Sequence, residues 1–441
     1  MARKLFGTDG VRGVAGELLS AELALALTHV ATAQLPVERP RVLIVRDTRE
    51  SGEMLEAAVA AGVAAAGGDA MLGGVLPTPA APLLLGRYGF DLAVVLSASH
   101  NPYQDNGIKF FGGDGYKLSD EAELAIEAAL ERGPASTPAP VGRVRELHGA
   151  GEDYLRELHA RFAELDLSGL DVLLDCANGA TYKLAPEIFS RLGASVTVHA
   201  AGPDGRNIND GCGSTHVAEL GRMMSEGGHA IGFAFDGDGD RVLAVDSRGT
   251  VVDGDELLAL AAGHLRRSGR LPGDGVAVTV MTNFGFHQAM QREGIEVAVT
   301  AVGDRYVLEA LRERGWALGG EQSGHLIEMG FNRTGDGIAG ALLTLEALGG
   351  ASLAERHAME KLPQRLVNVR VRDRGAIAGA ERVHDAVGEA ESELEGRGRV
   401  LIRASGTEPL VRVMVEAPTE DEADALCARL VAVVESELGA D

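Results

Sequence analysis

Short apolar runs alternate with longer segments of helical periodicity along most of this chain. Continuous apolar runs predict strands that are buried on both faces of a sheet, and they lie at 41–45, 71–76, 92–96, 171–175, 195–199, 230–235 and 276–280. Segments with apolar residues three or four apart predict helices, and they lie at 20–35, 54–66, 152–163, 185–192, 287–293 and 336–348. Alternation of these two kinds of element predicts an α/β fold.

The α/β pattern restarts twice, so the chain contains three units with the same order of strands and helices. Each unit runs from strand through polar turn to helix, and ends with a strand that leads into a polar loop. The three loops are SASHNP at 97–102, DGDGDR at 236–241 and GGEQSGH at 319–325. The units share almost no sequence, but if they are homologous the three loops occupy equivalent positions and converge on one cleft.

The last part of the chain has a different pattern. Strands are predicted at 367–371, 400–402 and 410–415, with helices at 380–394 and at the chain end. This pattern predicts a compact α+β domain. We therefore expect four domains, with boundaries at 1–150, 151–252, 253–364 and 365–441.

Composition narrows the possible partners and the cellular compartment. Acidic residues exceed basic ones by 65 to 41, which gives a net charge of −24 and disfavours nucleic acid and anionic membrane surfaces as partners. Three widely separated cysteines argue against a disulfide framework or a zinc site. The N-terminus lacks an apolar signal core, and no apolar run approaches the roughly 18 residues of a membrane span. We expect a cytoplasmic protein, which must gather positive charge locally if its substrate is an anion.

Ser99 is a candidate nucleophile. It stands beside His100 in the SASHNP loop, directly after the apolar strand at 92–96. In α/β sheets the loop at such a strand end is where ligands bind. The same sequence also suits an ordinary serine-rich turn, so its interpretation depends on the other loops.

The DGDGDR loop predicts a metal site. Asp236, Asp238 and Asp240 alternate with glycine, and in an extended loop this spacing places all three carboxylates on one side. They would repel one another without a cation, and oxygen ligands favour Mg²⁺ or Ca²⁺. The loop is not an EF-hand, because Arg241 and Ser247 stand where that motif requires Gly and Glu. A site of this kind suits Mg²⁺ shared with a phosphate oxygen, with Arg241 holding the same phosphate.

A serine close to Mg²⁺ and arginine can carry a phosphoryl group, and the transfer needs an acid and a base. Lys109 is one of only five lysines and is flanked by apolar residues. We expect desolvation and nearby arginine to lower its pKa toward a useful range. His100 could serve instead, or could hold the loop by hydrogen bonding.

Three further loops carry binding chemistry. Glu321 and Ser323 could bind sugar hydroxyls, although a polar turn explains them equally well. The segment RASGTEP at 403–409, with Arg412 beyond it, has the composition of a phosphate site or of a turn between strands. Arg12 lies in the glycine-rich segment 3–13, which is a weaker signal for an anion site.

These motifs together resemble the α-D-phosphohexomutase family over nearly the whole chain. The resemblance rests on FGTDGVRG at 6–13, SASHNP at 97–102, NGIKFF at 106–111, DGDGDR at 236–241, VGDRYV at 302–307, GGEQSGH at 319–325 and RASGTEPLVRV at 403–413. It implies four domains around a central cleft, the first three being similar α/β domains with mixed sheets. It also implies that Ser99 is phosphorylated and, with the three aspartates, binds one Mg²⁺. Lys109 would be the acid/base, supported by Arg12 and His100. The residues expected to bind substrate are Arg241, Glu321, Ser323, His325, Arg403, Ser405, Gly406, Thr407 and Arg412.

The resemblance also implies a reaction. Phospho-Ser99 would convert a hexose 6-phosphate into a 1,6-bisphosphate. This intermediate would reverse its orientation and return its 6-phosphoryl group to the enzyme. Gln322 within GEQSGH is typical of the branch acting on glucosamine phosphates, which supplies UDP-N-acetylglucosamine synthesis. Glucosamine or glucose 1,6-bisphosphate would be an activator, and the chain would form a homodimer. The alternatives are a phosphomannomutase or phosphoglucomutase, a non-catalytic sugar-phosphate-binding protein, and a serine hydrolase, although the chain lacks the G-x-S-x-G elbow around Ser99.

Overall fold

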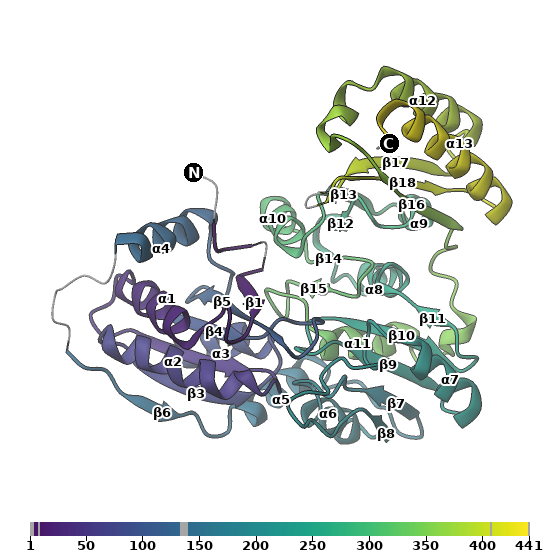
Figure 1. Ribbon diagram of the computed structural model, residues 1–441. Coiled ribbons are helices and arrows are strands. Elements are labelled where there is room, and N and C mark those ends of the chain that lie inside the picture. Colours follow the sequence, from purple (N-terminus) through teal and green to yellow (C-terminus); the bar gives the residue numbers. More distant parts are fainter. Residues whose placement is uncertain (1–3, 8, 133–139, 406–407, 440–441) are drawn as a thin grey trace. The chain divides into compact units, whose positions relative to one another are not determined.

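The computed structural model describes residues 4–7, 9–132, 140–405 and 408–439 (Figure 1). The chain divides into two compact units, which are described separately. Unit 1 comprises Met1–Met281 and Ile295–Arg356, and unit 2 comprises Thr282–Gly294 and His357–Asp441. None of the helices in the described part of the chain combines the length and the apolar character needed to cross a lipid bilayer.

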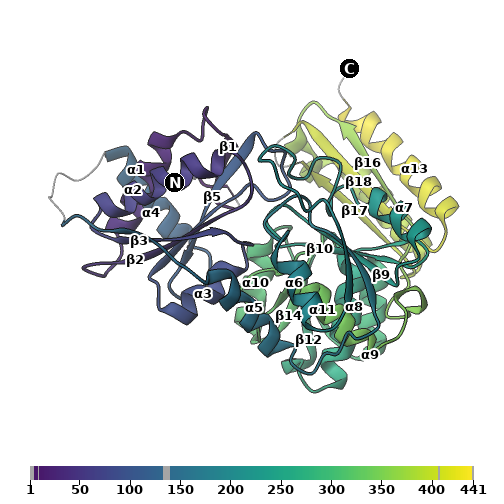
Figure 2. The same cartoon turned by 90° about the horizontal axis from the view of Figure 1, so that it is seen from below.

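The first sheet of unit 1 has the order β1-β5-β4-β2-β3-β6. Its strands are β1 (Val11–Val14), β2 (Arg41–Arg46), β3 (Asp69–Val75), β4 (Leu92–Leu96), β5 (Asp105–Gly112) and β6 (Val144–Glu146). Its helices are α1 (Ala21–Ala33), α2 (Ser51–Ala65), α3 (Ala80–Tyr88) and α4 (Asp120–Arg132). Figure 2 shows α1 and α2 on one face of this sheet and α3 on the other. With helices on both faces, the apolar run of β4 is buried along its whole length.

The second and third sheets have the orders β11-β10-β9-β7-β8 and β13-β12-β14-β15. Their strands are β7 (Asp171–Asp175), β8 (Ser195–His199), β9 (Ile231–Phe235), β10 (Val242–Asp246), β11 (Val251–Val252), β12 (Gly275–Thr279), β13 (Glu296–Thr300), β14 (Leu318–Gly320) and β15 (Leu326–Glu328). The accompanying helices of unit 1 are α5 (Ala150–Arg161), α6 (Leu184–Arg191), α7 (Ala218–Gly227), α8 (Gly254–Arg267), α10 (Asp304–Arg314) and α11 (Gly337–Leu348).

The three sheets share one four-stranded core. Each has three parallel strands followed by an antiparallel fourth: β3-β2-β4-β5, β8-β7-β9-β10 and β13-β12-β14-β15. The three polar loops predicted from sequence each connect the third strand of this core to the fourth. They therefore occupy equivalent positions in three copies of one topology.

Unit 2 is an antiparallel sheet of order β16-β18-β17 packed against helices. Its elements are β16 (Gln364–Arg370), α12 (Glu381–Leu394), β17 (Arg399–Ala404), β18 (Leu410–Glu416) and α13 (Glu420–Leu438). It also includes α9 (Phe284–Glu293), because the Asn283 side chain that caps α9 donates to the carbonyl of Leu362 at 3.0 Å. The helix predicted within the third domain thus packs with the C-terminal part of the chain.

The predicted strands and helices are present, with ends shifted by a few residues. Segment 3–13, predicted as a glycine-rich loop, contains most of the edge strand β1, which pairs with β5. Strand β5 was not predicted either. It places Lys109 beside the SASHNP loop, because Leu96 pairs with Ile108 and Val95 with Lys109.

Candidate active site

The three equivalent loops line one cavity of unit 1. Its volume is about 410 Å³, and its walls are formed by Gly7, Asp9, Gly10, Arg12, His100, Asp240, Arg241, Val302, Gly303, Asp304, Glu321 and His325. Each of the three loops contributes a polar side chain, and the segment before β1 supplies a fourth wall. The convergence inferred from the repeated plan is therefore present in the structure.

Ser99 lies at the meeting point of two of these loops. Its side chain is buried, and its hydroxyl donates to Asp236 Oδ2 at 2.5 Å. His100 Nδ1 lies 3.3 Å from the same hydroxyl. The Ser99 backbone has φ +53°, a left-handed conformation that is uncommon for residues other than glycine. This conformation is a strain that the surrounding contacts must compensate.

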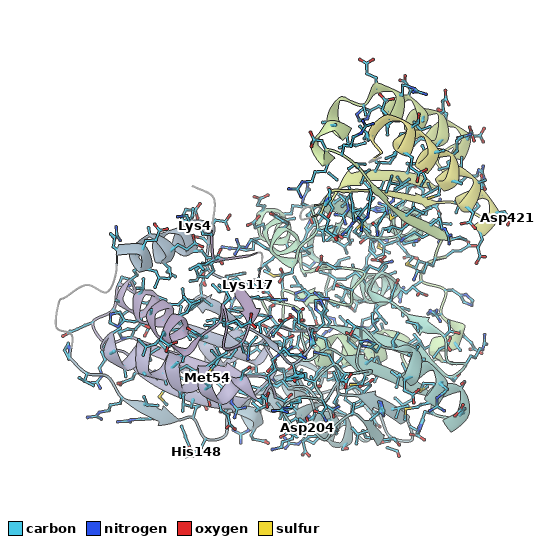
Figure 3. The ribbon with its side chains drawn as sticks, in the orientation of Figure 1. Lys4, Met54, Lys117, His148, Asp204 and Asp421 are labelled. Carbon is cyan, nitrogen blue, oxygen red and sulfur yellow. The ribbon has the colours of Figure 1, made fainter. Side chains whose placement is uncertain are left out.

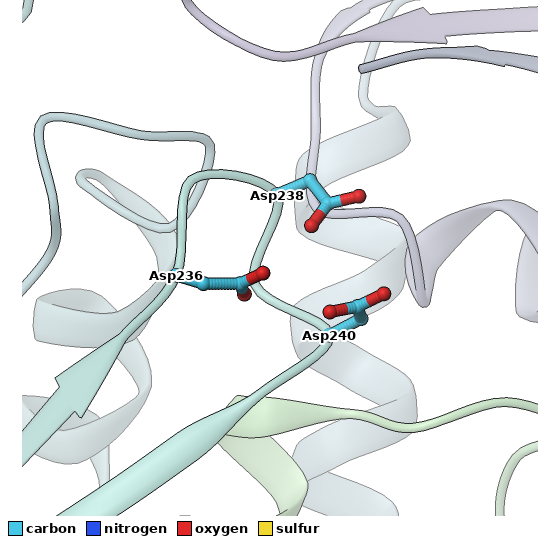
Figure 4. Close-up of side chains that lie close together, drawn as sticks. All are labelled: Asp236, Asp238 and Asp240. Atoms are coloured by element: carbon cyan, nitrogen blue, oxygen red, sulfur yellow. The ribbon is translucent and has the colours of Figure 1, made fainter. Parts of the chain in front are cut away.

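Asp236, Asp238 and Asp240 form a cluster of buried carboxylates (Figure 4). One oxygen from each can be chosen so that all three lie within 4.8 Å of one another. The loop is a tight turn between the antiparallel strands β9 and β10, with Gly239 at φ +70°. The expected convergence of the side chains is thus present, but the turn produces it, and the expectation of an extended loop was wrong.

The electrostatics of this cluster favour a cation. Burial, together with the like charges of Asp240 and Asp238, raises the pKa of Asp236 well above its usual value. The Oδ1 atoms of Asp238 and Asp240 are buried and accept no hydrogen bond from the described residues. Such oxygens suit a hard divalent cation, so the donor set fits Mg²⁺.

Lys109 is held among carboxylates. Its Nζ lies 2.8 Å from Asp238 Oδ2, 2.9 Å from Asp9 Oδ2 and 3.8 Å from Asp240 Oδ2. Burial alone would lower its pKa, but these three carboxylates outweigh burial and raise the pKa. The expectation of a lowered pKa was therefore wrong, because the sequence did not reveal how many acidic groups surround this lysine.

Three other basic groups, Arg12, His100 and Arg241, line the cavity. Arg12 is paired with Asp9 through Nη2, and the Nε atoms of Arg12 and Arg241 are buried without a hydrogen-bond acceptor among the described residues. Burial, with the positive charges of Arg241 and Arg12, lowers the pKa of His100 to about 4, so its ring is neutral near pH 7. The cavity therefore offers donors that an anionic ligand could use.

The GEQSGH loop presents only part of its polar set to the cavity. Glu321 lines it, and its Oε1 accepts from the amide of Gly303 at 3.2 Å. His325 also lines it, and its Nε2 accepts from the amide of Gly335 at 3.0 Å. Ser323 is exposed. Gln322 donates to Asp253 Oδ2 at 3.2 Å, so its amide is engaged with the residue that caps α8.

The structure adds residues that sequence reasoning missed. Lys117 Nζ lies 2.5 Å from Asp9 Oδ1 and 2.5 Å from Asp304 Oδ2, which joins the first domain to the third inside unit 1 (Figure 3). Thr78 Oγ1 donates to Asp238 Oδ2 at 2.6 Å. The scarcity of lysine was a signal for Lys117, and Asp9 and Asp304 stand within FGTDGVRG and VGDRYV. No feature of the sequence distinguished Thr78.

Unit 2 contains the proposed phosphate loop. Arg403 and Arg412 are direct cross-strand partners on β17 and β18. Burial and the like charge of Arg412 lower the pKa of Arg403, and such a pair is destabilising without an anion. Ser405 is buried, and its Oγ accepts from the amide of Glu408 at 3.3 Å. Gly406 and Thr407 lie outside the described residues.

Gly237 allows the metal loop to approach the serine loop. A Cβ at this position would lie 2.6 Å from the Ser99 carbonyl oxygen and 2.7 Å from Asn209 Nδ2. We expect Gly237→Ala to displace the Ser99 loop and to lower the turnover number at least about tenfold, with a lower Tm. Gly86→Ala in α3 is the matched control, because its Cβ would meet open space and a helical Gly→Ala change stabilises by about 0.5–1 kcal/mol. Unchanged turnover in Gly237→Ala would show that this close approach is not required.

Family models match the chain in four consecutive segments. They describe the phosphoglucomutase/phosphomannomutase alpha/beta/alpha domains I, II and III and the C-terminal domain, and they match residues 3–136, 147–249, 253–366 and 366–433 respectively. The order and coverage agree with a four-domain α/β architecture.

Similar proteins extend over the full chain. The chain is 48% identical to a protein of Bacillus subtilis (strain 168) named phosphoglucosamine mutase, over 99% of both sequences. A phosphoglucomutase/phosphomannomutase family protein from Burkholderia thailandensis matches with a TM-score of 0.82 and 23% identity, over 98% of this chain and 97% of that chain. The Aspergillus fumigatus N-acetylphosphoglucosamine mutase, in a crystal structure with GlcNAc-6P and magnesium, matches with a TM-score of 0.70 and 20% identity, over 99% and 96% of the two chains.

Proposed function

This chain belongs to the phosphoglucomutase/phosphomannomutase family, and we propose that it interconverts glucosamine 6-phosphate and glucosamine 1-phosphate. It is a mutase, an isomerase that moves a phosphoryl group between two positions of one sugar. The name carried by the full-length relative at 48% identity supports glucosamine phosphates as its substrates. The product would supply the synthesis of UDP-N-acetylglucosamine.

One observation carries the proposed chemistry. The Ser99 hydroxyl lies 2.5 Å from a carboxylate of the three-aspartate cluster, next to a cavity lined by Arg12 and Arg241. A serine hydrolase of the Ser-His-Asp type would need a base to activate its serine but would have no use for the carboxylate cluster. A phosphoryl carrier needs positive charge around the group that it transfers, and this cluster with bound Mg²⁺ would provide it.

The proposed cycle has two transfers. In the first, the bond between phosphorus and Ser99 Oγ breaks, a bond forms to the sugar O1, the sugar hydroxyl loses its proton and Ser99 gains one. The resulting 1,6-bisphosphate then reverses its orientation, so that its 6-phosphoryl group faces Ser99. In the second transfer the bond between phosphorus and the sugar O6 breaks, a bond to Ser99 Oγ forms, Ser99 loses its proton and O6 gains one. Lys109 is the proposed acid/base, because Mg²⁺ bound to the aspartates would cancel part of the negative charge that raises its pKa in the metal-free protein. His100 and Arg12 support the reacting groups.

The cation belongs to this proposal as well. Asp236, Asp238, Asp240 and a phosphoryl oxygen on Ser99 would hold one Mg²⁺. When bound, Mg²⁺ neutralises charge on the phosphoryl oxygens during transfer. Arg241 would contact the same phosphoryl group from the cavity wall.

The remaining polar groups are assigned to substrate recognition. Glu321, Ser323 and His325 would contact the sugar or its phosphate. Arg403, Ser405, Gly406, Thr407 and Arg412 would hold the phosphate that is not reacting. The like-charged pair of Arg403 and Arg412 supports this assignment, because a bound phosphate dianion would remove the repulsion.

Assays with purified protein test the proposal. Glucosamine 6-phosphate should give glucosamine 1-phosphate in the presence of Mg²⁺ and glucose or glucosamine 1,6-bisphosphate as activator. The value of kcat/KM should be higher for glucosamine phosphates than for glucose or mannose phosphates. A preference for glucose or mannose phosphates would assign the chain to a phosphoglucomutase or phosphomannomutase instead. Sedimentation of the same preparation would test the expected homodimer.

Removing one arginine of unit 2 should affect substrate binding more than turnover. We expect Arg412→Ala to raise KM for glucosamine 6-phosphate about 30-fold, since a charge-assisted hydrogen bond contributes about 1.5–3 kcal/mol. The Tm should stay within a degree, because the change also removes the repulsion with Arg403. Arg365→Ala on β16 is the control, since its exposed side chain pairs with Asp424 on the same unit. Equal KM values for both variants would contradict the phosphate assignment.

A further inference from the structure

Arg49 is wholly buried, although it carries a permanent charge. Its side chain has 0% exposure, and its single ionic partner among the described residues, Asp47, is equally buried. Taking two charges out of water costs several kcal/mol per ion, and apolar replacements of such pairs are often as stable. Stability of the core therefore does not account for an arginine at this position.

All five N–H donors of the Arg49 guanidinium are used. Nε donates to Asp47 Oδ2 at 2.8 Å, and Nη1 and Nη2 donate to four backbone carbonyl groups. Three of these carbonyl groups belong to the loop after β4, those of Ser99, Asn101 and Pro102, and the fourth is that of Asp105, the first residue of β5. A lysine has three donors on a single nitrogen and cannot reproduce this set of five hydrogen bonds, which we call the Arg49 fork.

The backbone of Ser99 is held on both sides by this arrangement. Its carbonyl accepts from Arg49 Nη2 at 2.9 Å, and its amide donates to Ser97 Oγ at 2.9 Å. Ser97 Oγ in turn donates to Asp47 Oδ2 at 2.6 Å. A second donor, Asn209 Nδ2 from the second domain, reaches the same Ser99 carbonyl at 2.9 Å.

We propose that Arg49 is a positioning residue for the phosphoryl-carrying serine, acting with Asp47 and Ser97. The Arg49 fork fixes the carbonyls of the loop, and the Asp47–Ser97 pair fixes the Ser99 amide. Together they hold Ser99 at φ +53°, where its hydroxyl points to Asp236. Without them the residue would relax toward the right-handed or extended regions, which are favoured for a serine, and Oγ would leave the carboxylate cluster. This inference rests on the proposed function, because it assigns Arg49 to the geometry of the serine that the function uses.

The test compares two arginine-to-lysine variants. Arg49→Lys keeps the charge beside Asp47 but loses the fork, so kcat should fall about 100-fold while KM for glucosamine 6-phosphate stays within about twofold. Arg161→Lys is the matched control, since Arg161 has a side-chain exposure of 12% and forms ion pairs with Glu328 and Glu346, away from the Ser99 loop. It should lose comparable thermal stability and keep its kcat. Equal kcat values in the two variants would overturn the proposal.

A second measurement separates positioning from folding. Each variant is incubated with glucose 1,6-bisphosphate, and intact mass records the phosphoryl group on Ser99, an increase of about 80 Da. Charging should be slow in Arg49→Lys and normal in Arg161→Lys. If Arg49→Lys does not fold, Ser97→Ala takes its place in the test. Its kcat should be about tenfold lower, and phosphorylation of its Ser99 should also be slow. Normal phosphorylation and a normal kcat in Ser97→Ala would overturn the proposal. Failure of the proposed function would look different, because the unaltered protein would then show neither mutase activity nor phosphorylation of Ser99.

Discussion

Ser99→Ala should abolish mutase turnover, lowering kcat by about 10⁴-fold or more. Ser99 is the group that the proposed mechanism uses to carry the phosphoryl between its two transfers, and loss of a covalent nucleophile removes the whole covalent route. Binding of the sugar phosphate should persist, because the cavity walls and the arginines of unit 2 are unchanged. Steady-state turnover of glucosamine 6-phosphate, with substrate affinity from calorimetry, measures both effects.

The control for this variant replaces another serine, at a position where we expect no effect on activity. Ser225→Ala in α7 deletes an exposed hydroxyl that donates to the carbonyl of Arg222 on the same helix. It should keep full activity and carry the same phosphoryl mass at Ser99. Peptide mapping of both proteins after incubation with glucose 1,6-bisphosphate locates the modification. Full turnover in Ser99→Ala would exclude the phosphoserine mechanism.

Local patterns predicted much of the fold and of the site. The continuous apolar run at 92–96 could only be stable as a strand covered on both faces, and Ser99 follows it immediately. The Asp-Gly alternation at 236–241 predicted a carboxylate cluster, and the cluster is present, although a turn and not an extended loop brings the side chains together. The equivalence of the three loops followed from the repeated plan, and the three sheets share the topology that this equivalence requires.

What the sequence did not predict depends on contacts between distant segments. The pKa of Lys109 moves upward because Asp9 and Asp238, which are far apart in the sequence, both contact its Nζ, a pairing that no local pattern contains. Segment 3–13 reads as a loop because of its glycines, but residues 11–14 form a strand, since β5 offers them an unpaired edge. Arg49 looks like a polar turn residue in the sequence, and its role becomes visible only when the four carbonyls around it are known.

Asp236→Asn should separate metal binding from stability. The carboxylate of Asp236 is disfavoured by burial and by the like charges of Asp240 and Asp238, so a neutral amide should leave the Tm of the metal-free protein unchanged or higher. The amide has nearly the same shape, and its oxygen can still accept from the backbone amide of Arg241. The variant should nevertheless lose Mg²⁺ binding, and with it at least about 10³-fold in turnover.

The same experiment contains its own reference. In the unaltered protein, Mg²⁺ at 100 times its Kd should add about 2.7 kcal/mol to the free energy of unfolding and raise Tm by several degrees, because the cation binds only the folded state. In Asp236→Asn this rise should disappear, whereas Asp204→Asn, an amide substitution in an exposed turn, should keep it (Figure 3). A metal-free Tm that is unchanged or higher, combined with a lost Mg²⁺ response, cannot arise from simple damage to the fold, because damage would lower the metal-free Tm. A full Mg²⁺ response in Asp236→Asn would show that the cation binds elsewhere, and the charge neutralisation proposed for phosphoryl transfer would lose its basis.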